Sequence, residues 1–207
     1  KSGDLQGART LFEKSLSLDP MSSDALLGLG RIHYLNKDYD LALSAFRRAH
    51  TFNRRAPQPL WHLLSVFVIL DEMQDVADSY NLLFEVEQPD KVFTSLLKTC
   101  QQTSSILLEQ LARTYLSTHP TEFSLITLFA KYYLKSNRAV EALGLLSAFG
   151  DPPNPSGDFV LAKAVAFHDL GFSEKANLVL MAYLKTCDPT DLAWSPLLML
   201  QHYLPGR

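Results

Sequence analysis

The chain has 207 residues, 47% of them hydrophobic, and a formal net charge of -3. This apolar fraction supports a large buried core, which excludes a disordered tail or linker. A charge this close to neutral does not suit a surface that neutralises nucleic-acid phosphates, and two cysteines are too few for a disulfide scaffold.

Leucine dominates the apolar residues, with 38 Leu against 9 Val and 4 Ile. Unbranched leucine favours helices, whereas sheets favour β-branched side chains. Apolar residues also recur at i, i+3, i+4 and i+7 along the whole chain, which predicts an all-α protein. The expected helices cover residues 4–18, 23–36, 39–53, 58–71, 74–87, 90–101, 105–118, 121–136, 139–149, 158–170, 173–187 and 191–204.

The chain repeats itself with a period of about 34 residues. The period predicts units of two helices and two short turns, in which small residues allow close helix contacts and large ones fill the gaps between units. The matching pairs are Asp4 and Asp38, Ala8 and Ala42, Phe12 and Phe46, and Ala142 and Ala176, with the turn Asn137-Arg138 matched by Gly171-Phe172.

The unit resembles a tetratricopeptide repeat. Between Ser23 and Pro57, the characteristic positions of that family are occupied by Leu26, Leu29, Gly30, His33, Ala42, Phe46 and Ala49. Placing Ala77 at the small position of the next second helix puts Trp61 at the aromatic position of its first helix. Trp194 falls at the same position of the last unit.

The resemblance implies a tetratricopeptide-repeat-like α-solenoid, a right-handed superhelix of antiparallel helix pairs with a concave groove. We expect residues 1–207 to form a single domain of about six repeats, truncated at both ends.

Units 58–120 fit the pattern poorly, because Asn81 and Ala112 stand at a bulky position and Leu108 at a small one. Residues 151–157 are expected to form a loop inserted between two helices. We also expect the side chains of Ala42 and Phe46 to be buried between helix pairs.

No motif for catalysis or cofactor binding is present: GxSxG, GxxxxGK[ST], HExxH and GxGxxG are all missing. The six histidines include no pair at i+3 or i+4, so we expect no metal and no cofactor. Cys100 and Cys187 are interpreted as structural thiols. Arg47-Arg48 and Arg54-Arg55 could form a patch for an acidic partner, although favourable charge at a helix C-terminus is the simpler interpretation.

The resemblance also implies a binding groove lined by the first helix of each unit. Carried over unit by unit, the partner-binding residues are Asp24, Leu27, Arg31, Tyr34, His62, Val66, Thr127, Lys131, Lys135, Leu161, His168, Met199 and His202. Co-chaperones of the ninety-kilodalton heat-shock protein use a carboxylate clamp of Lys, Arg and Asn in such a groove. Helix 58–71 has neither Lys nor Arg, so that mode of binding is disfavoured.

The sequence therefore predicts a non-catalytic interaction scaffold or adaptor that binds a peptide, a helix or a subunit of a multi-protein complex. The alternative is a regulatory or targeting module of a larger protein whose enzymatic domain lies outside this segment. An enzyme within the segment is a weaker third hypothesis. No apolar run reaches the length that a membrane-spanning helix requires, and the N-terminus has no apolar signal region. We therefore expect a soluble segment that does not span a membrane or bind nucleic acid.

Overall fold

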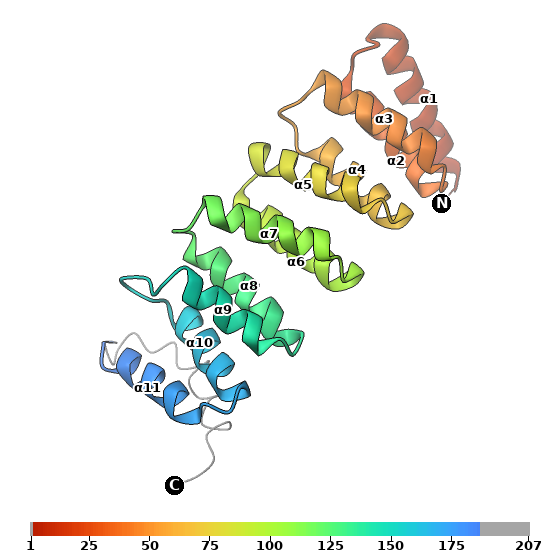
Figure 1. Cartoon of the computed structure of the whole chain (residues 1–207). Coiled ribbons are helices and arrows are strands. Elements are labelled where there is room, and N and C mark those ends of the chain that lie inside the picture. Colours follow the sequence, from red (N-terminus) through yellow and green to blue (C-terminus); the bar gives the residue numbers. More distant parts are fainter. Residues whose placement is uncertain (1, 187–207) are drawn as a thin grey trace. The chain divides into compact units, whose positions relative to one another are not determined.

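The computed structural model describes residues 2–186, with side chains from Leu5 onward. This part of the chain consists of helices joined by turns and loops, and it contains no strand. Successive helices within a pair run antiparallel (Figure 1). The helices are α1 (Ser2–Leu18), α2 (Ser23–Leu35), α3 (Tyr39–Phe52), α4 (Gln58–Leu70), α5 (Met73–Val86), α6 (Pro89–Thr103), α7 (Ile106–Thr118), α8 (Phe123–Lys135), α9 (Ala139–Ala148), α10 (Gly157–Asp169) and α11 (Ser173–Leu184). The expected all-α fold and its helix ranges are confirmed for these residues; the expected helix 191–204 lies outside them.

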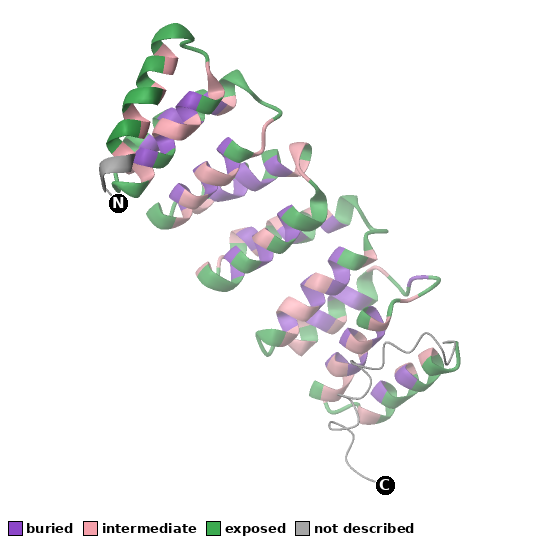
Figure 2. Ribbon diagram, turned by 180° about the vertical axis from the view of Figure 1, so that it is seen from behind, coloured by how far each residue is buried: buried purple, intermediate pink, exposed green. Residues whose placement is uncertain are grey.

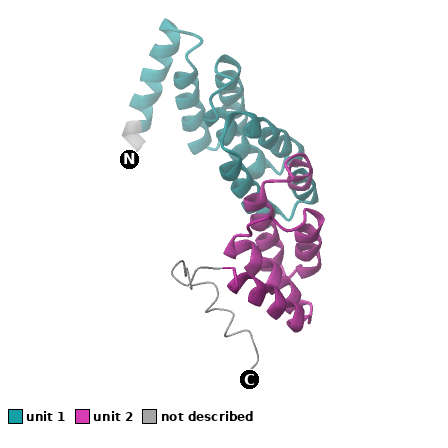
Figure 3. Ribbon diagram, turned by 90° about the vertical axis from the view of Figure 1, so that its left-hand side faces the viewer, with its two compact units in different colours: residues 1–111 teal, residues 112–207 magenta. Residues whose placement is uncertain are grey.

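The chain divides into two compact units, Lys1–Leu111 and Ala112–Arg207 (Figure 3). Helices adjacent in sequence pack against each other from α1 to α6 in the first unit and from α8 to α11 in the second. The first helices of neighbouring pairs also touch, as α2 touches α4 and α8 touches α10. Each unit is thus a stack of helix pairs. The single continuous domain expected from the sequence stays a prediction.

A repeated turn closes the first helix of each pair. Just beyond the helix, one turn residue adopts a left-handed backbone conformation, with φ 65° at Lys37, 60° at Asp71, 55° at Asn137 and 83° at Gly171. In each turn the next backbone N–H donates to the carbonyl five residues earlier, the hydrogen bond of a Schellman motif. These bonds are Asp38 to His33 (2.9 Å), Glu72 to Phe67 (3.0 Å), Arg138 to Tyr133 (2.9 Å) and Phe172 to Phe167 (2.8 Å). Ser104, with φ 51°, ends α6 in the same conformation. The five turn residues therefore give one common reference point for every first helix.

Ala42 and Phe46 of α3 are fully buried, as the sequence predicts. Gly30 of α2 lies against Phe46: a Cβ atom added to this glycine would come within 2.4 Å of the ring. Gly28 is similarly close to Phe12 of α1, at 2.3 Å. Glycine at these positions thus allows α2 to approach its neighbours on both sides. Figure 2 shows the buried residues gathered on the helix sides that face other helices.

The repeat register of the second pair differs from the sequence prediction by one residue. Val76, Tyr80 and Leu83 lie one full repeat period after Ala42, Phe46 and Ala49, and all six are fully buried. The counterpart of Ala42 is therefore Val76 rather than Ala77. In α4, Leu60 corresponds to Leu26, each 1% exposed, so the assignment of Trp61 to that position is wrong.

In this register Tyr80 occupies the bulky position of the second helix, and its polar hydroxyl is buried. Its hydroxyl hydrogen-bonds the hydroxyls of Thr99 (2.7 Å) and Ser95 (3.1 Å) on α6. A tyrosine is thus accommodated at the bulky position because its polar end has partners. With Tyr80 at that position, Asn81 becomes an exposed residue and the apparent mismatch at Asn81 disappears.

In the second unit, α8 to α11 repeat the same arrangement. Ala142 and Ala176, one repeat period apart, are both buried, as expected. The inserted loop lies between α9 and α10, and it ends where the Ser156 hydroxyl caps α10 by accepting from the Phe159 N–H at 3.2 Å. Lys163 of α10 pairs with Asp151 in this loop. The loop is therefore tied to the helix that follows it.

Candidate functional site

The turn residues make it possible to compare the first helices position by position. In the first unit, the residues two, three, six and ten positions before each turn residue are all exposed or half-buried. We call this set the first-helix face of the first unit: Leu27, Arg31, Tyr34 and Leu35 on α2, Trp61, Ser65, Val68 and Ile69 on α4, and Thr94, Lys98, Gln101 and Gln102 on α6.

This face carries large apolar side chains in contact with solvent. Leu35 is 61% exposed and Ile69 is 48% exposed. Half-buried aromatic residues lie beside them: the Tyr34 ring meets Tyr39 edge to face at 6.1 Å, and the Lys91 ammonium lies 5.5 Å from the Trp61 ring centre. Apolar and aromatic groups held on rigid helices are typical of protein-binding surfaces.

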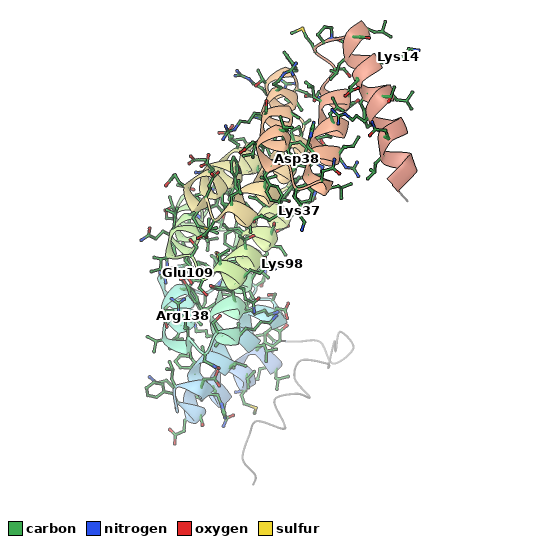
Figure 4. The ribbon with its side chains drawn as sticks, turned by 90° about the vertical axis from the view of Figure 1, so that its right-hand side faces the viewer. Lys14, Lys37, Asp38, Lys98, Glu109 and Arg138 are labelled. Atoms are coloured by element: carbon green, nitrogen blue, oxygen red, sulfur yellow. The ribbon has the colours of Figure 1, made fainter. Side chains whose placement is uncertain are left out.

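The charges on this face are mainly positive. Arg31 and Lys98 are both exposed, six residues before their turn residues, and neither makes an ion pair within the described part of the chain. Figure 4 labels Lys98 on α6, and also Lys37 and Asp38 at the end of α2. Next to Arg31, His62 stacks on Phe46 at a ring distance of 4.9 Å. Burial and then the charge of Arg31 lower the pKa of His62, so both disfavour the protonated imidazole.

Four of the residues predicted from the sequence belong to α2. Leu27, Arg31 and Tyr34 lie on the first-helix face, and Asp24 is exposed in the first turn of the helix. On α4, His62 is half-buried in its stack, and Val66 is fully buried and therefore belongs to the core. The error at Val66 follows from the register shift, which also hid Trp61 and Ser65. An alignment on the turn residue Asp71 would find these two. Lys98 was missed because no groove residue was assigned to the helix that carries it.

In the second unit, Lys131 and Lys135 lie on α8, and Leu161 and His168 lie half-buried on α10. The Lys131 ammonium pairs with the Asp158 carboxylate of α10 at 2.8 Å, and His168 lies 3.6 Å from Asp169.

Thr127 is only 5% exposed, and its hydroxyl donates to the Phe123 carbonyl at 2.7 Å. It is a packing residue in the structure, so its assignment to the groove is corrected here. Thr127 stands at the same repeat position as Leu27, but its shorter side chain is covered by neighbouring residues. The predicted residues Met199 and His202 lie outside the described residues.

The second unit also contains a mainly apolar pocket of about 270 Å³. Phe159, Val160, Val179 and Tyr183 supply its apolar wall, and the paired Lys163 and Asp151 lie at its edge. The pocket opens between α10, α11 and the inserted loop. It is separate from the predicted residues Lys131 and Lys135 of α8.

The thiol of Cys100 is fully buried, and burial raises its pKa to about 12. A thiol with such a pKa stays protonated at neutral pH and is a poor nucleophile. Among residues 2–186, no group of three His, Cys, Asp or Glu side chains is placed to hold a metal ion. None of the helices described here combines the length and the apolar character needed to cross a membrane.

Comparison with known proteins agrees with this repeat architecture. The family model for the tetratricopeptide repeat matches residues 1–58. The TPR repeat-containing protein YpiA of Bacillus subtilis (strain 168) is 23% identical over 110 residues, 53% of this chain. The match spans only 25% of the length of that relative.

A solved structure, that of YrrB, described as a TPR protein with an unusual peptide-binding site, resembles this chain with a TM-score of 0.50 and 12% identity. The likeness covers 92% of this chain and 97% of YrrB, and at this identity it concerns the fold alone. Stacked helix pairs of this kind define the class of helical-repeat scaffolds. Within that class, residues 1–58 match the tetratricopeptide repeat model, and the fold of the chain resembles that of YrrB. The fold supports a general role in protein–protein interaction.

Proposed function

We propose that the protein is a non-catalytic scaffold that binds a protein segment on the first-helix face of its repeats. One observation carries the proposal. On α2, α4 and α6 of the first unit, the same four positions stay open to solvent, while the opposite sides of these helices are packed. These positions hold large apolar and aromatic side chains on α2 and α4, and a basic side chain on α2 and on α6.

The energetics favour this face as a binding surface. Exposed apolar area such as that of Leu35 and Ile69 has no stabilising role in the unit itself, and a bound partner would remove it from water at roughly 25 cal/mol per Å². Tyr34 and Arg31 are of the residue types most often found as interface anchors. Because all these side chains project from helices, binding requires little ordering of the face.

A pair of matched leucines tests the proposal. Leu35, on the first-helix face, is 61% exposed, and Leu41, on the second helix α3, is 55% exposed. A photo-crosslinking amino acid is placed at either position of the protein in the cells that produce it. We expect discrete crosslinked proteins from position 35, and we expect the identified partner, once purified, to crosslink there again and not at position 41. Crosslinks from position 41 alone, or from neither position, would contradict the proposal.

The alternative function, a regulatory or targeting module of a larger protein, is favoured by one observation. The chain spans only about a quarter of the length of its curated relative YpiA. In that case the first-helix face would bind a segment of the same polypeptide. The experiment separates the two functions, because position 35 would then give an internal crosslink in the full-length protein.

A further inference from the structure

The charged side chains of the first unit are segregated. At the twelve positions of its first-helix face, Arg31 and Lys98 are the charged residues. Carboxylates of this unit lie instead on second helices, as Asp75 and Asp78 do on α5, at helix starts such as Asp24, or beyond the end of a first helix, as Asp71 does after α4. The Asp75 carboxylate already has a partner there, since Arg47 of α3 approaches it to 3.9 Å.

The corresponding charge in the second unit is neutralised internally. Lys131 occupies the position of Arg31 and Lys98, six residues before its turn residue Asn137. Its ammonium is paired with Asp158 of the next first helix at 2.8 Å. No such carboxylate lies opposite Arg31 or Lys98 in the described part of the first unit. The two units therefore present different charge to a partner, although their folds repeat.

The geometry of the first unit limits the length and conformation of a segment that could contact both cations. Arg31, Ser65 and Lys98 each stand six residues before the turn residue of α2, α4 and α6. Because α4 packs on α2 and packed helices lie 8–10 Å apart, the same spacing from α4 to α6 would separate the two charges by roughly 20 Å. An extended chain advances about 3.3 Å per residue and crosses that distance in about six residues. Between the two cations it would pass Ser65, and beside it lie Leu35 and Ile69.

We propose that the first unit binds an extended acidic segment of a partner protein, with carboxylate side chains about six residues apart at Arg31 and Lys98 and apolar side chains between them. Resting on the proposed function, this inference names the chemistry of the partner and the unit that holds it. Pairing of the two cations with a partner gives each a counter-ion that the fold itself does not supply. An apolar residue in the segment contacts Leu35 and Ile69, which places both recognition elements on one face.

Selection from a peptide library tests this directly. The probe is a phage-displayed library of random dodecapeptides, fused through their C-termini so that no free terminal carboxylate is present. Selected peptides are then synthesised with amidated ends and titrated against the purified chain. We expect Asp or Glu at two positions about six residues apart, with an apolar residue between them. Affinity should fall about tenfold or more on Arg31→Glu and on Lys98→Glu, and also when NaCl is raised from about 50 to 300 mM.

Arg48→Glu is the matched control, because Arg48 is an exposed arginine on the second helix α3 and the net charge changes equally. It should change affinity by less than about twofold. Peptides without acidic residues, or an equal loss in Arg48→Glu, would overturn the acidic-segment inference. If such peptides still bind and lose affinity on Tyr34→Ala or Leu35→Ala, the proposed function stands and only its partner chemistry is wrong. Selection of no peptide by the intact chain would overturn both.

Discussion

Gly30 determines how closely α2 and α3 can approach. The ring of Phe46 occupies the space where a side chain would begin, so even a methyl group at position 30 would have to displace a fully buried aromatic ring. We expect Gly30→Ala to destabilise the protein by about 1–3 kcal/mol, the usual cost of overpacking a core. The measurement is urea unfolding followed by circular dichroism.

Gly144 provides the control for this substitution. It lies inside α9 with nothing within 4 Å of the position of an added Cβ. Gly144→Ala should therefore stabilise its helix by about 0.5–1 kcal/mol, because alanine loses less conformational freedom than glycine. Equal effects of the two substitutions would show that α2 and α3 are not in the close contact described here.

Cys100 should be chemically inert in the folded protein. With a pKa of about 12, only about one thiol in ten thousand is ionised at pH 8, and the side chain is also fully buried. In a Cys187→Ser variant, reaction with Ellman's reagent at pH 8 should be slower than in 6 M guanidinium by a factor of at least about one thousand. A native rate within tenfold of the unfolded rate would mean that this side of α6 is not covered by the helices packed against it.

At the scale of the element, the left-handed turn after each first helix is the most regular feature of the fold. Three of the turn residues, Lys37, Asp71 and Ser104, are neither glycine nor asparagine, so they adopt this conformation at some cost. We expect Lys37→Gly to stabilise the protein by about 0.5–1 kcal/mol, since glycine tolerates a φ of 65° without strain.

Lys98→Gly is the corresponding control, because the backbone of Lys98 has the ordinary right-handed helical conformation. Lys98 lies inside α6, where glycine should cost about 1 kcal/mol relative to a good helix former. Lys37 and Lys98 are both exposed, so the two variants differ chiefly in backbone conformation (Figure 4). Destabilisation by both, measured by thermal melting, would argue against the left-handed turn at Lys37.

These elements also show what could be predicted from the sequence. Helix positions and the burial of Ala42 and Phe46 follow from periodicity, because helical packing requires apolar residues at fixed intervals. The shift at Val76 could not be found in the same way. Adjacent apolar residues such as Val76 and Ala77 fit a helix stripe equally well, so periodicity does not show which of them corresponds to Ala42.

The candidate site was predicted less completely for the same reason. Arg31 and Tyr34 were found, because Gly30 fixes the register of α2. Val66 was misassigned, since no glycine marks the corresponding contact in α4. The pairing of Lys131 with Asp158 could not be predicted, because it joins two first helices whose separation depends on the packing between them.

At the scale of the whole molecule, stability should vary along the chain. Among the described side chains of α1, from Leu5 to Leu18, none is fully buried, whereas α4 has six buried residues. In hydrogen exchange followed by mass spectrometry on this 207-residue chain, we expect amides of residues 5–18 to exchange at least about 100-fold faster than those of residues 60–70. Equal protection of the two segments would indicate that the first unit opens only as a whole.

The recurrence of one turn conformation has a consequence for how such a chain can change in evolution. Lys37 and Asp71 have nearly the same backbone conformation, one repeat period apart, and each is followed by the start of a second helix. Loss of residues 38–71 would join α2 directly to Glu72 and α5 through a turn that already exists. Gain of a copy of this segment would likewise add one such turn. Recombination between these points would therefore lengthen or shorten the protein by whole helix pairs while every remaining turn keeps its geometry, and the number of sites offered to partners would change in equal steps.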